Sequence, residues 1–195
     1  GKPLEDETMQ YCYFCKNNQH LYEQGKAAFV YNRSMKSSIA AFKYGARKEY
    51  GRYYAAELAK KHESWIKKTG AQALIPVPIH KERHKKRGYN QAKVIADYLE
   101  GETGIPVIDD YLIRIKNTEA LKELSAAERK ASLEDAFLVS ETSKLLYRNL
   151  RCVILVDDIY TTGSTINECA ATLKKSGVLK VYFLCACIGK DQGGE

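Results

Sequence analysis

The sequence lacks any apolar run that approaches the roughly 18 residues needed to span a bilayer. Its N-terminus does not resemble a signal peptide, and it contains no internal repeat or low-complexity tract. These absences argue against membrane, secreted and repeat proteins, so a cytoplasmic location without a transmembrane segment is the default expectation. The 195 residues, of which 45% are apolar and 28% charged, are typical of one globular α/β domain with a small appendage.

Cysteine is limited to six residues, which in a cytoplasmic protein should be mostly thiols. Four of them lie in apolar segments and are expected in the core: Cys152, Cys169, Cys185 and Cys187. Cys12 and Cys15 instead have the Cys-x-x-Cys spacing of a structural zinc site, but they supply only half of the four ligands. Either they are thiols without a metal, or Zn²⁺ is bound with further ligands, such as His20 or a cysteine pair upstream.

The most informative segment runs from residue 153 to residue 165 and reads Val-Ile-Leu-Val-Asp-Asp-Ile-Tyr-Thr-Thr-Gly-Ser-Thr. Its continuous aliphatic start predicts a central parallel strand that is covered on both faces. The residues from 164 to 176 then show helical apolar spacing, and the buried face of this helix should hold Ile166, Cys169, Ala170 and Leu173. The stretch from Thr161 to Thr165 is therefore predicted to be a turn at a helix N-terminus.

Such a turn is suited to a phosphate group. Backbone N–H groups and the positive end of the helix dipole point out of a helix N-terminus, and hydroxyl groups add further donors. The preceding Asp157 and Asp158 would repel a phosphate, but they suit sugar hydroxyls or a Mg²⁺ ion carried by the ligand. Together the two features predict a site for a ribose 5-phosphate, with its phosphate on Thr161, Thr162, Gly163, Ser164 and Thr165.

Other interpretations of this segment are a Walker A loop, a response-regulator receiver domain, and a strand, turn and helix without a ligand. The first lacks the required lysine before the hydroxyl residue. The second would need more residues than follow Asp158. The third is disfavoured because a strand end seldom places two adjacent acids before such a turn.

Short apolar runs alternate with amphipathic segments along the rest of the chain. The predicted strands are residues 27–31, 73–77, 105–108, 111–115, 136–139, 151–156 and 180–188. The predicted helices are residues 34–44, 51–69, 90–100 and 164–176, and one more that opens with a capping-box pattern at 125–128. The stretch 140–149 is the most linker-like. This alternation predicts an α/β fold with a parallel sheet and helices on both faces.

A basic segment follows the predicted strand at 73–77. It should face the same crevice as the phosphate turn, because parallel sheets bind ligands beyond the carboxyl ends of their strands. Its cations suit a pyrophosphate group, which arginine can contact bidentately. The alternative is a solvated basic helix face. The candidate pyrophosphate residues are Val77, Pro78, Ile79, His80, Arg87, Gly88, Asn90 and Gln91.

Aromatic and basic residues also alternate between residues 42 and 54. With a formal net charge of +7, this pattern is typical of proteins that stack the bases of single-stranded nucleic acid and contact its phosphates. The alternative is a plain amphipathic helix that buries several of the tyrosines. The candidate nucleic-acid contacts are Lys43, Tyr44, Arg47, Lys48 and Arg52.

The segment 153–165 resembles the signature of type I phosphoribosyltransferases, which bind 5-phosphoribosyl 1-pyrophosphate with Mg²⁺. By that resemblance Asp157 and Asp158 hold the ribose 2- and 3-hydroxyls, and residues 161–165 wrap the 5-phosphate. Three further features narrow the resemblance to the ComF family of competence-associated proteins. They are the Pro-Val-Pro run with Arg-Gly-Tyr-Asn-Gln-Ala after it, Phe-Lys-Tyr-Gly at 42–45, and the Cys-x-x-Cys pair.

Resemblance to the ComF family implies a partial zinc ribbon at residues 1–25 and a phosphoribosyltransferase-like domain at 26–195. It also implies a link to natural transformation, in which single-stranded DNA is imported. Single-stranded DNA and other competence proteins are therefore expected partners.

The same resemblance bears on catalysis. Arg87, together with Lys116 or Arg114, would offset charge on a departing pyrophosphate, while Asp157 and Asp158 fix the sugar. Leu121 and Ser132, however, stand where the family commonly has glutamine and asparagine. The resemblance implies no acceptor substrate. The alternative function is a nucleic-acid-binding accessory protein whose ribose-phosphate pocket is sensory or degenerate and supports no turnover.

Overall fold

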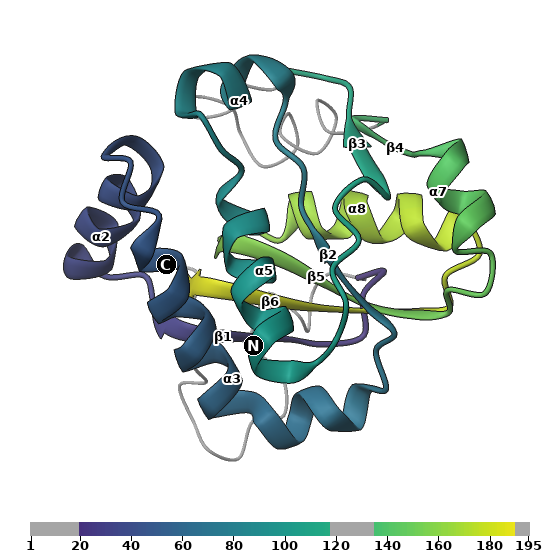
Figure 1. The fold of residues 1–195 in the computed structure, drawn as a ribbon, viewed down its shortest axis with the longest axis horizontal. Coiled ribbons are helices and arrows are strands. Elements are labelled where there is room, and N and C mark those ends of the chain that lie inside the picture. Colours follow the sequence, from purple (N-terminus) through teal and green to yellow (C-terminus); the bar gives the residue numbers. More distant parts are fainter. Residues whose placement is uncertain (1–19, 118–134, 190–195) are drawn as a thin grey trace, which may run out of the picture.

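The computed structural model describes residues 20–117 and 135–189. Four strands form a parallel sheet in the order β1-β6-β5-β2, as Figure 1 shows. These strands are β1 (Gly25–Val30), β2 (Ala73–Pro76), β5 (Cys152–Tyr160) and β6 (Lys180–Ile188). The helices are α2 (Arg33–Tyr44), α3 (Glu49–Thr69), α4 (Lys81–Arg87), α5 (Gln91–Thr103), α7 (Glu141–Leu146) and α8 (Ser164–Lys175).

Helices cover both faces of this sheet (Figure 1). Helices α2, α3 and α5 pack on one face, where Leu74 and Ile154 belong to their buried cluster. Helix α8 packs on the other face, with Ile75 and Leu155. Neighbouring residues of one strand thus point into opposite cores, which is the alternation of a strand buried on both sides. The predicted α/β class with helices on both faces is confirmed.

Strand β5 and helix α8 form as the sequence predicts. The residues from Val153 to Val156 are fully buried, and Val153 is in register with Ala73 on β2 and Val181 on β6. Burial of a side chain such as Leu173 favours folding by roughly 2 kcal/mol, which anchors the helix on the sheet. The buried face of α8 consists of the four predicted residues, Ile166, Cys169, Ala170 and Leu173.

The four cysteines of the described part are thiols. Cys169, Cys185 and Cys187 are fully buried, as predicted, whereas Cys152 is half-buried and its thiol donates to the Thr69 carbonyl at 3.2 Å. Burial raises the pKa of the Cys169 and Cys185 thiols well above the usual value and that of Cys187 to about 12. These thiols therefore pack the core as small apolar groups.

Two short segments differ from the sequence-based prediction. The predicted strand at 105–108 is reduced to a single bridge between Val107 and Leu74. The predicted linker at 140–149 contains α7, because the Ser140 hydroxyl accepts a hydrogen bond from the Ser143 backbone at 3.3 Å and so begins a helix. The helix predicted from residue 125 lies outside the described residues.

Strands β3 (Leu112–Arg114) and β4 (Phe137–Val139) pair in a small sheet of their own. Their pairing is antiparallel, a feature that the predicted alternation of strands and helices did not specify. Leu112 and Phe137 reach the core beneath this sheet, whereas the outer pair, Ile113 and Leu138, is about half exposed. Strands of three residues are too short for sequence periodicity to indicate their direction.

The outer edge of the parallel sheet at β1 is covered by α3. The helix has non-helical backbone angles at His62 (φ −127°, ψ 17°). At this kink the His62 Nε2–H donates to the Ala27 carbonyl at 2.9 Å, and Lys61 Nζ donates to the Ala28 carbonyl at 2.9 Å. Side chains of α3 thus hydrogen-bond to backbone carbonyls of the edge strand and help to cover it.

Residues 20–24 pack against the α/β domain just before β1. The Leu21 backbone N–H donates to Asn167 Oδ1 at 2.7 Å, and the Glu23 N–H donates to the Val181 carbonyl at 2.7 Å. The predicted domain boundary after residue 25 stays a prediction, since residues 1–19 lie outside the described part. In the part that the structure describes, no helix combines the length and apolar character needed to cross a membrane.

Candidate functional site

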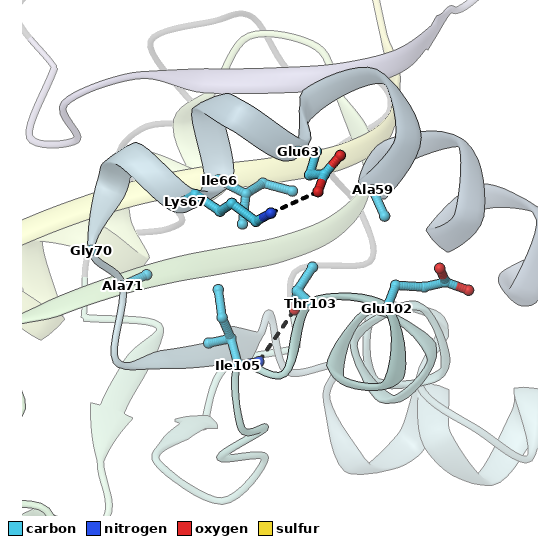
Figure 2. A pocket seen from close by; sticks show the side chains of 9 residues that line it. All are labelled: Ala59, Glu63, Ile66, Lys67, Gly70, Ala71, Glu102, Thr103 and Ile105. Atoms are coloured by element: carbon cyan, nitrogen blue, oxygen red, sulfur yellow. Dashed lines mark hydrogen bonds and ion pairs between the residues drawn. The ribbon is translucent and has the colours of Figure 1, made fainter.

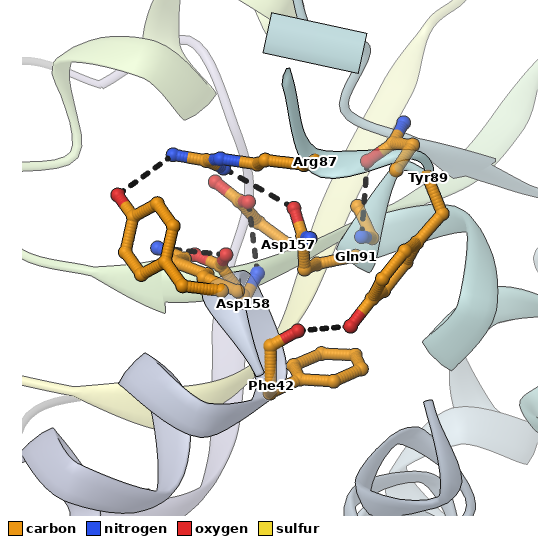
Figure 3. Close-up of polar contacts among 10 residues, drawn as sticks. Phe42, Arg87, Tyr89, Gln91, Asp157 and Asp158 are labelled. Carbon is orange, nitrogen blue, oxygen red and sulfur yellow. Dashed lines mark hydrogen bonds and ion pairs between the residues drawn. The ribbon is translucent and has the colours of Figure 1, made fainter. Parts of the chain in front are cut away.

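Asp157 and Asp158 lie near the carboxyl end of β5, inside the strand rather than after it. The Asp158 backbone N–H donates to Asp157 Oδ1 at 2.8 Å, a contact drawn in Figure 3. Lys43 Nζ, from the last turn of α2, lies 2.8 Å from Asp158 Oδ2. Burial and the neighbouring Asp158 raise the pKa of Asp157 to about 7, although Lys43 and Arg114 oppose this.

This arrangement engages one oxygen of each carboxylate within the protein. Asp157 Oδ1 accepts the backbone N–H, and Asp158 Oδ2 contacts the ammonium of Lys43. Within residues 20–117 and 135–189, no further hydrogen bond to either carboxylate is found. One oxygen on each of two adjacent residues therefore remains as an acceptor, which matches the two hydroxyls of a vicinal diol.

The turn at 161–165 begins α8 without a side-chain cap. Gly163 is the N-cap residue with φ 76°, and its carbonyl accepts the Asn167 N–H at 2.8 Å. By contrast, Asn32 caps α2 and Asn90 caps α5 with a side-chain oxygen. The first N–H groups of α8 are thus left without a side-chain acceptor, which is the arrangement of an anion site. The hydroxyls of Thr162 and Ser164 lie 3.0 Å apart in the same turn.

Aromatic side chains support this turn from the core. Tyr160, the last residue of β5, stacks on Phe183 of β6 with ring centroids 4.7 Å apart and planes within 4°. Its hydroxyl also lies 2.6 Å from the hydroxyl of Tyr22. Sequence reasoning missed this support because Tyr22, Tyr160 and Phe183 are distant in the chain.

The predicted pyrophosphate segment lies at the carboxyl end of β2. The Val77 N–H continues the sheet by donating to the Val156 carbonyl at 2.9 Å, and Asn90 Nδ2 donates to the Val77 carbonyl at 3.0 Å. His80 is buried and accepts the Glu82 N–H at 3.4 Å as the cap of α4. Pro78 and Ile79 are half-buried between these anchors. The structure thus brings this loop to the same sheet edge as Asp157.

Helix α4 carries the cations of this segment and buries none of its residues. It ends at Gly88, which has φ 79°. At its last turn, Arg87 Nη1 donates to Gln91 Oε1 at 3.1 Å, and Arg87 Nη2 donates to the Tyr44 hydroxyl at 3.3 Å, as Figure 3 shows. The guanidinium also lies 5.3 Å from the centroid of the Tyr44 ring. Arg87 is thus held in place beside the site by two neutral partners, Gln91 and Tyr44.

The end of α2 forms a wall of the same site, because it contacts both Asp158 and Arg87. Two of the residues predicted to contact nucleic acid lie here, since Lys43 contacts Asp158 and Tyr44 contacts Arg87. The Tyr89 hydroxyl donates to the Phe42 carbonyl and so ties the end of α2 to the loop between α4 and α5 (Figure 3). Sequence analysis noted Phe-Lys-Tyr-Gly at 42–45 as a motif, but no spacing rule relates it to β5.

The other predicted nucleic-acid residues lie outside the pocket, around the start of α3. Arg47 is exposed and pairs with Glu49 at 3.4 Å, and Arg52 is exposed. Lys48 lies with its ammonium 5.0 Å from the centroid of the Tyr89 ring. Arg47 and Arg52 thus remain exposed cations near the start of α3.

Arg114 in β3 lies close enough to Asp157 for their charges to interact. It is half-buried, and its guanidinium lies 5.3 Å from the centroid of the Phe137 ring. Burial lowers the pKa of Arg114 and Arg83 adds to this, whereas Asp157 acts in the opposite sense. Lys116 is exposed, and its carbonyl accepts a hydrogen bond from Arg114 Nε at 3.3 Å. Leu121 and Ser132 lie outside the described residues.

A separate hollow of about 230 Å³ lies away from these residues, near the amino end of β2 (Figure 2). It is bordered by the last turns of α3 and α5, and an ion pair between Glu63 and Lys67 at 2.7 Å lies on its wall. None of the predicted site residues lines it. The residues that do are Ala59, Glu63, Ile66, Lys67, Gly70, Ala71, Glu102, Thr103 and Ile105.

Metal ligands are sparse among the described residues. No group of three or more His, Cys, Asp or Glu side chains is placed there to hold a metal ion. Asp157 and Asp158 therefore fit Mg²⁺ only if the ligand supplies most of its oxygens, as phosphates do. Cys12 and Cys15 lie outside the described part, so their zinc site stays a prediction.

Fold and site together define a type I phosphoribosyltransferase-like domain, with an acid pair at the end of a central parallel strand and a glycine-containing turn before a helix. No family model matches the chain. Over 111 residues it is 40% identical to Competence protein F of Haemophilus influenzae, covering 56% of this chain and 47% of that protein.

Two further relatives agree with this. The chain is 27% identical over 157 residues to Competence protein ComFC of Bacillus subtilis, covering 80% of this chain and 60% of that protein. It is 32% identical over 114 residues to DNA utilization protein YhgH of Escherichia coli, covering 58% of this chain and 48% of that protein. The relatives, which are named for competence and for DNA utilization, agree with the resemblance to the ComF family. The chain spans about half the length of the curated relatives it matches.

Proposed function

We propose that this chain binds 5-phosphoribosyl 1-pyrophosphate, or a close ribose phosphate, in the service of competence and DNA uptake. The observation that supports this ligand is the position of Asp157 and Asp158 beside the uncapped N-terminus of α8. Acceptors for a diol adjoin donors for a phosphate, and a ribose 5-phosphate presents both groups. The proposed role in competence and DNA uptake is supported by the names of the relatives.

The two arginines of the site support binding of a pyrophosphate rather than of a single phosphate. Arg87 and Arg114 reach the site from different elements, and both are half-buried, which strengthens their interaction with an anion. Bound with the ligand, Mg²⁺ would offset charge on the pyrophosphate oxygens. The residues that would adjoin such a complex are Asp157 and Asp158.

Transfer from such a ligand would break the bond between the anomeric carbon and pyrophosphate and form a bond to a nucleophile. The protein's part would be largely electrostatic. Asp157 and Asp158 would hold the sugar as positive charge grows at its anomeric carbon, while Arg114 and Lys116 would offset the charge of the leaving pyrophosphate.

Calorimetric titration of phosphoribosyl pyrophosphate with Mg²⁺ tests the ligand. We expect saturable binding that the double variant Asp157→Asn/Asp158→Asn loses. The matched control is Asp97→Asn/Asp109→Asn, which removes two partly exposed carboxylates paired with Lys93 outside the site. Absence of binding by the unaltered protein would overturn the proposal.

A second candidate function is binding of single-stranded nucleic acid beside the pocket. The observation that favours it is the exposure of two aromatic rings, Tyr44 (64% exposed) and Tyr53 (56% exposed), beside Arg47 and Arg52. Tyr44 contacts Arg87 and Tyr53 stacks on Phe29, yet more than half of each side chain stays exposed, where a base could stack. The neighbouring Tyr54 is buried, so only part of the aromatic pattern is core.

Fluorescence anisotropy with a labelled single-stranded oligonucleotide tests the second candidate. We expect affinity to fall with salt and to drop severalfold in Tyr53→Ala and Arg52→Ala, with no effect of Asp157→Asn/Asp158→Asn. Tyr98→Ala, on the exposed side of α5, is the control. Equal affinity in all variants would exclude this surface.

A further inference from the structure

Lys43 belongs to the candidate site and is mostly buried against Asp158. The side chains of Lys43 and Asp158 are 18% and 12% exposed, and their charged atoms lie 2.8 Å apart. Other lysine–carboxylate pairs of the described part are more open, such as Lys93 with Asp97, at 42% and 47%. Separating a buried ion pair would leave an uncompensated charge away from water, which is costly. The ammonium of Lys43 is therefore held firmly against the acid pair.

The ammonium changes what the acid pair can bind. Two adjacent ionised carboxylates attract a divalent cation and repel a phosphate. With Lys43 in contact, the pair carries at most one net negative charge, and Asp158 Oδ2 is already occupied. A divalent cation would need several oxygen ligands close to a fixed positive charge, whereas neutral hydroxyl groups need only the acceptor oxygens that remain.

We propose that Lys43 is a specificity-determining residue: by neutralising Asp158 it makes the acid pair a receptor for a neutral ribose diol beside a phosphate, and it prevents the pair from holding a divalent cation alone. The identity of the sugar rests on the proposed function. The exclusion of a free metal ion rests only on the geometry of Lys43, Asp157 and Asp158.

Binding of Mn²⁺ alone, followed by electron paramagnetic resonance, tests the exclusion. We expect no tight Mn²⁺ site in the unaltered protein and a new site, bound at least about tenfold more tightly, in Lys43→Met. Lys93→Met removes an ammonium from a contact of the same 2.8 Å length outside the pocket and should gain nothing. Asp158→Asn added to Lys43→Met should remove the new site. Equal Mn²⁺ binding in Lys43→Met and the unaltered protein would overturn the proposal.

Lys43→Arg keeps the positive charge and should exclude Mn²⁺ as the unaltered protein does. Melting temperatures of both variants separate a folding defect from a change in specificity. If Lys43→Met does not fold, Lys43→Gln, which keeps a polar group near Asp158 without the charge, takes its place. A Lys43→Arg protein that is folded and binds Mn²⁺ as the neutral variant does would show that charge is not what excludes the ion.

Ribose 5-phosphate titrated without metal tests the second half of the proposal. We expect Lys43→Met to bind it about tenfold more weakly than the unaltered protein, because uncompensated carboxylates repel the phosphate. Added Mg²⁺ should recover most of this loss in the variant. Equal affinities without metal would overturn the role of Lys43 and leave the proposed function standing. If the unaltered protein binds no ribose phosphate, the proposed function fails, while the Mn²⁺ comparison still decides what Lys43 does.

Discussion

The hydroxyl group of Tyr160 occupies the space that a side chain on Gly163 would need. A Cβ atom added to Gly163 would lie 2.4 Å from Tyr160 Oη and 2.7 Å from its Cζ. The φ of 76° at Gly163 is also one that residues with a Cβ rarely adopt. Two independent constraints thus require glycine at the start of α8.

Gly163→Ala should therefore distort the turn at 161–165 and weaken ribose-phosphate binding by more than about tenfold, with a loss of roughly 1–3 kcal/mol in unfolding free energy. Calorimetry and urea denaturation measure the two effects. Gly101→Ala is the control, because its Cβ would meet open space inside α5, where alanine is the better helix former. A Gly163→Ala protein with unchanged affinity would show that the turn does not bind the ligand.

Asp157 should make stability depend on pH. Burial and Asp158 raise its pKa to about 7 from the usual 3.8, so the folded state holds the proton more tightly than the unfolded state. Stability is then lost as the pH rises from about 4 through 7. Asp157→Asn removes this loss. We therefore expect the free energy of unfolding of the variant to exceed that of the unaltered protein by roughly 2–4 kcal/mol at pH 8. Near pH 4 the two should differ little.

Urea denaturation at a series of pH values measures this difference. The exposed Asp97, altered to asparagine, should give no comparable gain at pH 8. If Asp157→Asn were less stable than the unaltered protein at pH 8, the carboxylate would be ionised and well stabilised in the folded state.

Tyr89→Phe should loosen the wall formed by the end of α2. The buried Tyr89 hydroxyl donates to the Phe42 carbonyl, and its loss leaves that carbonyl unsatisfied. We expect about 1–2 kcal/mol lower unfolding free energy and a weaker affinity for the ribose phosphate. Tyr98→Phe, whose ring is 41% exposed on α5, serves as the control. If stability fell and the affinity did not change, the contact between Tyr89 and Phe42 would support the fold but not ligand binding.

His62 should make the edge of the sheet sensitive to acid. Burial lowers the pKa of His62 below 6.5, although its hydrogen bond to the Ala27 carbonyl partly offsets this. The unfolded state therefore binds the proton more readily, and stability falls as the pH drops through 6.5. We expect His62→Gln to flatten this fall between pH 7 and 5 in urea denaturation, whereas His84→Gln on the exposed surface of α4 should not. A steeper fall in His62→Gln would contradict this assignment.

The sequence predicts the parts of the fold that depend on local pattern. Strand β5 and the buried face of α8 follow from a continuous aliphatic run and from helical spacing, and both were found where they were predicted. Ser140 as a cap of α7 was missed because a short polar stretch also fits a linker. The pairing of β3 with β4 was missed because it depends on packing and not on the period of three residues.

The sequence predicts only those parts of the candidate site whose residues are neighbours in the chain. Asp157, Asp158 and the turn at 161–165 lie in one segment, so their chemistry can be inferred from order alone. The contacts of Asp158 with Lys43 and of Arg87 with Tyr44 each join residues from different elements. Nothing in the local pattern specifies such pairs, because they depend on how α2 packs beside β5.

The sheet order has a consequence for synthesis on the ribosome. Strand β6, the last strand of the described residues, lies between β1 and β5. Until residue 188 has emerged, β1 has no partner in the sheet and the acid pair has no β6 beside it, although Asp157 is in register with Cys185. Helices of the nascent chain can therefore form early. The candidate site, however, can be completed only after nearly all of this sequence has been translated.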